Sequence, residues 1–200
     1  VNPFAKGGDL NGMSLDFDGV YRGYGHARHM GRTVAGAVLQ VYDKVHYTDV
    51  DSIRCASRRV EIPANRPDPG DLPRAYRIDQ LHREGRDAEL PYKEMELTTA
   101  VAEAQRMIRL AHGPDVFPLS LHALAIGGAA FVGIPGEPFS EVGRQLKLAE
   151  GWQMVLPTCN TNDKAGYFPV QEAYDEGGYE ARSSPFKAGV AERLTEGGLR

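Results

Sequence analysis

The stretch LSLHALAIGGAAFVGIPGEPF, residues 119–139, holds two apolar runs on either side of a Gly-Gly pair. Apolar runs of this length are typical of strands, and a two-residue glycine turn between them is typical of a β-hairpin. The second run ends in a Pro-Gly turn, and Pro138 is suited to the first turn of a helix, where its missing N–H is harmless. We therefore expect an antiparallel hairpin, a stiff turn that carries Glu137, and a helix that begins near Pro138.

Outside this stretch, the hydrophobic spacing predicts both helices and strands. Apolar residues recur every three or four positions in the expected helices, whereas the expected strands are short and β-branched. Proline and glycine mark the loops. The expected helices are 21–45, 73–86, 92–112 and a final one from about 186; the strands are 52–62 and 152–156; the loops are 1–20, 63–73 and 157–184. The pattern indicates an α/β fold: a mixed sheet with an antiparallel hairpin flanked by helices, forming part of a domain.

The composition excludes some classes of function. The chain is 42% hydrophobic and 25% charged with a net charge of -4, which is ordinary for a globular protein. A basic face for broad nucleic-acid binding is not expected from this balance. No apolar run approaches the roughly 20 residues of a membrane-spanning helix. The two cysteines, Cys55 and Cys159, fit either a disulfide or two free thiols.

The chain begins VNPFAKGG, without an initiator methionine or a signal peptide, and stops at GGLR. We expect residues 1–200 to be a piece of a longer protein.

Glu137 stands between a Pro-Gly pair and a second proline, at a strand-to-helix junction where α/β folds commonly place ligands. A backbone held in this way suits a metal ligand or a catalytic base. The alternative is a carboxylate that only stabilises the start of the helix through the helix dipole.

A second candidate is GYFPVQEAYDEGGYE, residues 166–180, with tyrosines at 167, 174 and 179. A tyrosine beside a cation donates hydrogen bonds, moves protons or, when deprotonated, binds the metal. The alternative is aromatic packing that holds a long loop. The pair His26 and His29 has metal-binding spacing, but neighbouring arginines disfavour a cation there, and His122 fits a hydrogen-bonded core histidine.

Taken together and in this order, four motifs resemble the neutral/alkaline non-lysosomal ceramidase family, in its bacterial members. They are VNPF (1–4), the hairpin with IPGEPF (134–139), GYFP (166–169) and GGYEA (177–181). The resemblance covers nearly the whole chain and implies that residues 1–200 are the C-terminal portion of a ceramidase-like catalytic domain. Of the four motifs, the Pro-Gly-Glu turn is the most specific.

The resemblance implies a zinc-dependent hydrolase that cleaves an amide (N-acyl) bond with metal-activated water. Carried over residue by residue, the family's zinc-binding glutamate is Glu137 and its zinc-binding tyrosine is Tyr167. The tyrosine that stabilises the oxyanion falls on Tyr179. The two histidine ligands of the family match nothing in this sequence, so Zn²⁺ would need two further histidines from the N-terminal part of the same protein.

One position departs from the family pattern. Where ceramidases have a serine before a proline, this chain has Asn2, whose amide cannot act as a nucleophile. Asn2 remains a candidate hydrogen-bond donor to the substrate or the oxyanion. The expected partner is a small-molecule or lipid amide. The alternative is a non-catalytic homologue that keeps the fold and acts as a binding or structural protein.

Overall fold

The computed structural model describes residues 23–47 and 49–199. The chain divides into two units, Val1–Asp49 and Val50–Arg200, and each is described by itself. The expected loop 1–20 and the candidate Asn2 lie outside the described residues.

In the first unit, the described residues form helix α1, Gly23–Tyr42. The helix predicted over 21–45 is confirmed over Gly23–Tyr42, and it ends three residues earlier than expected. Its apolar positions Val34, Val38 and Val41 are more than half exposed, at 66%, 54% and 56%. Helical spacing therefore predicted the element correctly, while the burial that usually accompanies such spacing is not seen at these three residues.

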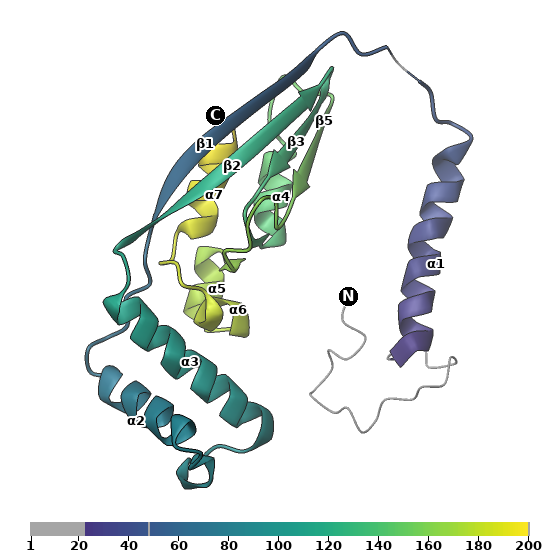
Figure 1. Ribbon diagram of the computed structural model, residues 1–200. Helices are drawn as coiled ribbons and strands as arrows, with labels where there is room; N and C mark the ends of the chain where they lie inside the picture. The colour runs from purple at the N-terminus through teal and green to yellow at the C-terminus, as the bar shows by residue number, and fades with distance from the viewer. Residues whose placement is uncertain (1–22, 48, 200) are drawn as a thin grey trace. The chain divides into compact units, whose positions relative to one another are not determined.

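The second unit is built on a four-stranded mixed sheet in the order β1-β2-β3-β5 (Figure 1). Strands β1 and β2 are antiparallel along eleven residue pairs, β2 and β3 form the expected hairpin, and β5 joins β3 in parallel. At the hairpin turn Gly127 has a φ of 54°, which favours glycine. The strands are β1 (Ile53–Pro63), β2 (Val116–Ile126), β3 (Ala129–Gly133) and β5 (Met154–Thr158).

Helices α4 (Ser140–Leu146) and α7 (Val190–Leu199) pack beside each other, α7 against β1 and β2 and α4 against β5. Leu119 and Leu121 of β2 and Leu194 of α7 are at most 4% exposed in the core that results. Burying a side chain of this size contributes about 1.5–3 kcal/mol. The same core contains Ile134, Val142 and Phe168, so it holds the segments next to Glu137 and Tyr167 in place.

Between β1 and β2 the chain forms a separate helical pair, α2 (Leu72–Arg83) and α3 (Glu94–His112). Both helices were expected, and α3 ends at His112, directly before the predicted Gly-Pro stop. Their contact has its own small cluster of Ala75, Ile78, Val101 and Ala104. A short 3-10 turn, Asp87–Glu89, lies in the connection between the two helices.

Several boundaries differ from the sequence-based expectation. Glu137 and Pro138 form a short strand, β4, and the helix begins only at Ser140, because Glu137 pairs with the β6 segment (Tyr167–Phe168). The segment 157–184 was expected to be loop, yet it contains β6 and two short helices, α5 (Gln171–Glu176) and α6 (Tyr179–Ser183). The final helix begins at Val190 rather than near Phe186.

Two further findings concern the whole described region. Cys55 and Cys159 are both exposed and free, which selects two thiols over a disulfide. Among the described helices, none combines the length and the apolar character that crossing a membrane requires.

Candidate metal and hydrolase site

The Pro-Gly-Glu turn is held by backbone hydrogen bonds to a single neighbouring segment, residues 158–168. Glu137 N–H donates to the carbonyl oxygen of Gly166 at 2.8 Å, and Ala165 N–H donates to Pro135 at 2.9 Å. Further bonds of 2.8–3.2 Å join Ile134 to Thr158 and Thr161, Gly136 to Asn160, and Phe139 to Phe168. The backbone is therefore held both before and after Glu137 in the chain. A stiff turn was expected from the sequence, but it is held mainly by tertiary hydrogen bonds.

Gly136 is required by this close approach. A Cβ at this position would lie 2.5 Å from the Gly166 carbonyl oxygen and 2.7 Å from the ring of Phe168. Phe168 is fully buried, so its ring cannot move aside without disturbing the core. The glycine of the Pro-Gly-Glu motif thus allows the two segments to touch.

Glu137 and Tyr167 are direct register partners on the parallel strands β4 and β6. Neighbouring strands lie about 4.8 Å apart, and register partners of a parallel pair project to the same side. The two residues come from positions thirty apart in the sequence, and the structure brings them together. Glu137 is exposed, and Tyr167 is half-buried.

The pKa of Tyr167 is raised, first by burial and then by the negative charge of Glu137, with smaller contributions from Tyr179 and Glu180. Both main causes disfavour the phenolate. Tyr167 is therefore a neutral phenol near neutral pH in the chain by itself. The same negative environment that opposes its ionisation favours a bound cation, whose charge would reverse the effect.

Tyr179 is the first residue of α6 and is 55% exposed. Its ring meets the ring of Tyr167 edge to face, with centroids 6.0 Å apart and planes at 71°. Aromatic pairs prefer this arrangement. The structure thus gathers Glu137, Tyr167 and Tyr179 into one cluster.

The buried side chain of Ser184 holds the backbone of Tyr167, and the sequence analysis did not assign this serine to the site. The hydroxyl of Ser184, which is fully buried, donates to the Tyr167 carbonyl oxygen at 2.9 Å. Tyr174 OH lies 3.0 Å from the Ser184 oxygen and donates to the Phe186 carbonyl at 2.7 Å. Tyr174 is therefore the loop-holding tyrosine of the three, as the packing interpretation described. The serine gave no sequence signal, because it acts only through the fold.

The other candidate residues lie elsewhere. His26 and His29 stack on α1 with ring centroids 6.4 Å apart, in the first unit. His122 is half-buried on β2. Among residues 23–47 and 49–199, no three His, Cys, Asp or Glu side chains gather as a metal site would require. Glu137 and Tyr167 thus offer two oxygen donors, which suits part of a zinc ligand set.

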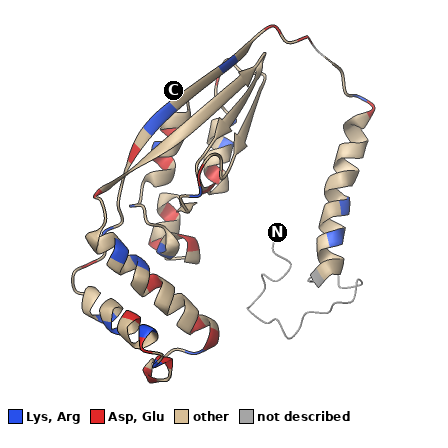
Figure 2. Ribbon diagram, viewed as in Figure 1, with Lys and Arg blue, Asp and Glu red and all other residues tan. Residues whose placement is uncertain are grey.

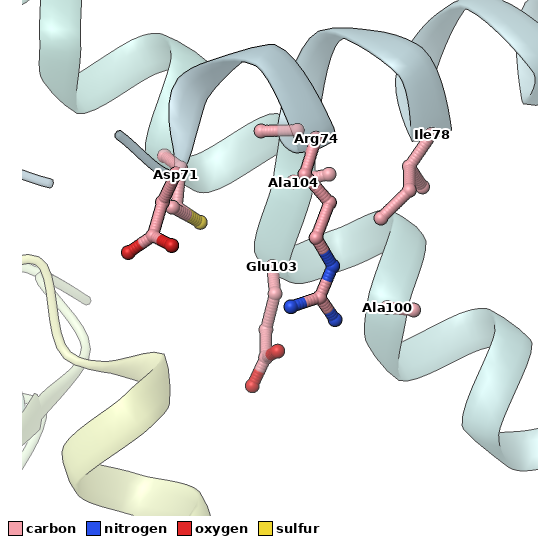
Figure 3. Close-up of a pocket in the computed structure, with 8 residues that line it drawn as sticks. Asp71, Arg74, Ile78, Ala100, Glu103 and Ala104 are labelled. Carbon is pink, nitrogen blue, oxygen red and sulfur yellow. The ribbon is translucent and has the colours of Figure 1, made fainter. Parts of the chain in front are cut away.

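A small hollow of about 130 Å³ lies between α2 and α3 (Figure 3). Arg74 and Glu103 project toward it, and Ile78, Ala100 and Ala104 form its apolar wall. Arg74 is held by a 2.7 Å hydrogen bond to Tyr92 OH. None of the residues singled out from the sequence lines this hollow.

No protein-family model matches the sequence. No curated protein is significantly similar to it. Among solved structures, the neutral ceramidase from Pseudomonas aeruginosa matches 74% of this chain with 15% identity and a TM-score of 0.44. A ceramidase complexed with C2 matches 43% of the chain with 22% identity and a TM-score of 0.37. The matched regions are 28% and 14% of those two chains, respectively. The similarity to these two ceramidases is partial, and this chain spans less than a third of the length of either.

Proposed function

We propose that this protein is a zinc-dependent hydrolase of an amide (N-acyl) bond, with Glu137 and Tyr167 as two of the zinc ligands. The observation that carries the proposal is the register pairing of these two residues on β4 and β6. A residue with a carboxylate and a residue with a phenol are thus neighbours on two strands, and backbone hydrogen bonds hold the chain before and after Glu137. Such fixing suits a metal site, which tolerates little error in ligand position.

Oxygen donors from a carboxylate and a phenolate fit zinc, and two histidines from the N-terminal part of the same protein would complete four ligands. Zinc at this position would polarise the scissile carbonyl and activate water. Glu137 would hold one side of the site. The burial of Tyr167 and the negative charge of Glu137 both oppose ionisation of the Tyr167 phenol. The phenol would therefore release its proton only when a cation binds.

Under this proposal, Tyr179 donates a hydrogen bond to the oxyanion that forms when the amide carbonyl is attacked. It borders Tyr167 and is exposed, so a substrate can reach its hydroxyl. Asn2 remains a second candidate donor to the substrate. The substrate class under this proposal is a small-molecule or lipid amide.

The metal assignment is tested by measuring zinc in the intact protein by elemental analysis, for the unmodified protein and for Glu137→Ala. We expect stoichiometric zinc that is lost together with N-acyl hydrolysis in Glu137→Ala. Glu141→Ala is the matched control, because it removes the same charge from an exposed residue four positions later. Full zinc content in Glu137→Ala would refute the ligand assignment.

Residues 1–200 alone are expected to bind zinc poorly and to be inactive, because two of the four ligands are missing. Micromolar or tighter zinc binding by this piece, measured by competition with a chelating dye, would contradict the assignment of outside histidines.

The role of Tyr179 is tested with Tyr179→Phe. Loss of one oxyanion donor is expected to lower kcat by about 100-fold or more, with zinc content kept. Tyr42→Phe, at a tyrosine on α1 that is 67% exposed, is the control. An unchanged rate in Tyr179→Phe would remove this role.

A second candidate is a non-catalytic homologue that binds a ligand or serves a structural role. The asparagine at position 2, where the resembled family has serine, favours it. A folded, intact protein without zinc and without activity on a panel of N-acyl amides would support this alternative.

A further inference from the structure

A second cleft, of about 460 Å³, lies between the C-terminal end of α3 and the segments around Gly166 and Ser183. Three basic side chains line it: Arg106 and Arg109 from α3, and Lys164 from the loop before β6. None of the described residues that line it is acidic. Figure 2 shows the same separation along α3, with basic residues toward the end that leads into β2 and acidic ones toward the other end. The remaining lining residues are Leu110, Gly113, Pro114, Phe117, Ala165, Gly166, Ser183 and Pro185.

Among the described residues, no acidic side chain forms an ion pair with Arg106, Arg109 or Lys164. Arg106 is half-buried and makes no hydrogen bond or ion pair with any described residue. Two acidic residues of this region pair with other arginines, Glu103 with Arg182 at 3.6 Å and Asp115 with Arg66 at 2.6 Å. Burial lowers the pKa of Arg106, Glu103 opposes this effect, and the like charge of Arg109 adds to it.

A basic residue in the last turn of a helix also offsets the helix dipole, which is a structural explanation for Arg109. It does not account for Lys164, which reaches the same cleft from another segment. The carbonyl oxygens at the end of α3 are moreover already served by Arg66, which donates to Leu110 and Gly113. Among the described residues, the three basic groups that line the cleft therefore have no ion-pair partner.

We propose that this cleft binds a phosphate-type anionic group, held by Arg106, Arg109 and Lys164 and backed by the apolar wall of Leu110 and Phe117. Arginine presents a planar fork of donors that matches phosphate oxygens, and residues three apart on a helix share one face. The ligand is either a soluble phosphate compound or the head group of a phospholipid, since the same chemistry serves both.

The cleft adjoins the Glu137 cluster through the backbone. Ala165 and Gly166 line the cleft, and the same two residues hydrogen-bond to Pro135 and Glu137. An occupant would therefore touch the loop that holds the proposed zinc ligands. The anion site nevertheless does not depend on zinc, and its test is a measurement of binding.

The experiment is a titration of the intact protein with inorganic phosphate, followed by calorimetry or amide NMR shifts, at low ionic strength. Saturable binding is expected, and Arg106→Gln/Arg109→Gln should weaken it by about 10-fold or more, given the usual strength of charge-assisted hydrogen bonds. The control is Arg144→Gln/Lys147→Gln, two exposed basic residues with the same spacing on or next to α4, which removes the same charge. Equal weakening by both double variants, or no saturable binding at all of phosphate or vesicles, would overturn the proposal.

Two further arms complete the test. Vesicles of phosphatidic acid in phosphatidylcholine, against phosphatidylcholine alone, separate a lipid head group from a free phosphate: binding of vesicles only, lost in the cleft variant, assigns the lipid source. Lys164→Gln, at an exposed loop residue, should weaken phosphate binding by several-fold. This single variant tests the cleft if Arg106→Gln/Arg109→Gln does not fold. Glu137→Gln should bind phosphate as the unmodified protein does, so failure of the zinc proposal and failure of this one are told apart.

Discussion

Replacing Gly136 with alanine would place a methyl carbon where the structure has no room. The added Cβ would lie 2.5 Å from the Gly166 carbonyl oxygen and 2.7 Å and 2.8 Å from two ring carbons of Phe168. Relief requires either moving a backbone segment or moving a ring that is fully buried. Overpacking of this kind costs about 1–3 kcal/mol. Separation of the two segments would also weaken the Glu137 N–H bond to Gly166, worth about 0.5–1.5 kcal/mol.

The expected loss in the free energy of unfolding is therefore about 2–4 kcal/mol. The assay is urea denaturation followed by circular dichroism and by the fluorescence of Trp152, the single tryptophan of the chain. The control is Gly143→Ala on α4, where an added Cβ meets only ordinary contacts at 3.9 Å and beyond. Because alanine favours helix, this control should be neutral or stabilised by up to about 1 kcal/mol. Equal stabilities of the two variants, within about 0.5 kcal/mol, would refute the argument that close approach requires Gly136.

Two further predictions concern the tyrosines around the site. In Glu137→Gln the pKa of Tyr167 should fall part of the way toward its ordinary value of about 10, because one opposing charge is removed while burial remains. The measurement is ultraviolet absorbance of the phenolate. An unchanged pKa would mean that the charge of Glu137 does not act on Tyr167. Since the folded state raises the pKa of Tyr167, its contribution to stability should be complete below about pH 10 and be lost as the pH rises through the folded value. Tyr174→Phe should lower the free energy of unfolding by about 1–3 kcal/mol, because it leaves the Phe186 carbonyl without its 2.7 Å donor and removes one of the hydrogen bonds to the Ser184 hydroxyl. The control in the same denaturation assay is Tyr42→Phe, at an exposed position, which should change stability by less than about 0.5 kcal/mol. A change as small as this in Tyr174→Phe would contradict the role of Tyr174 in holding the loop.

The boundaries that sequence reasoning missed have a common cause. Nothing local in Glu-Pro-Phe predicts that Glu137 will pair with Tyr167 across thirty residues, so the helix was expected two residues too early. In the same way α5 and α6 are short and separated only by Gly177 and Gly178, and they form where α6 packs against β6 and the two helices pack against each other. In α3, by contrast, the spacing of apolar residues was enough to predict the helix, and Val101, Ala104 and Leu110 on it are buried.

Some residues of the candidate site could likewise be identified from the sequence, and others only from the structure. Glu137, Tyr167 and Tyr179 were identified from motif resemblance, and the structure brings these three side chains into one cluster, whereas their metal and catalytic roles stay predictions. Ser184 gave no local signal, and Arg106, half-buried without a described partner, became conspicuous only in the fold. A buried serine bond or an unbalanced charge is a property of neighbours that the sequence separates by many residues.

What the amino-acid order determined by itself is the hairpin, the helices α1, α2 and α3 and the stiff Pro-Gly-Glu turn, since each follows from steric preference or hydrophobic spacing within a few residues. Only the tertiary structure decided that the turn is fixed by residues 158–168 and that the Glu137 carboxylate remains exposed. It also decided that three basic groups from two segments face one cleft. The physical reason is that contacts between distant segments depend on how the whole chain packs, which short-range preferences constrain without specifying.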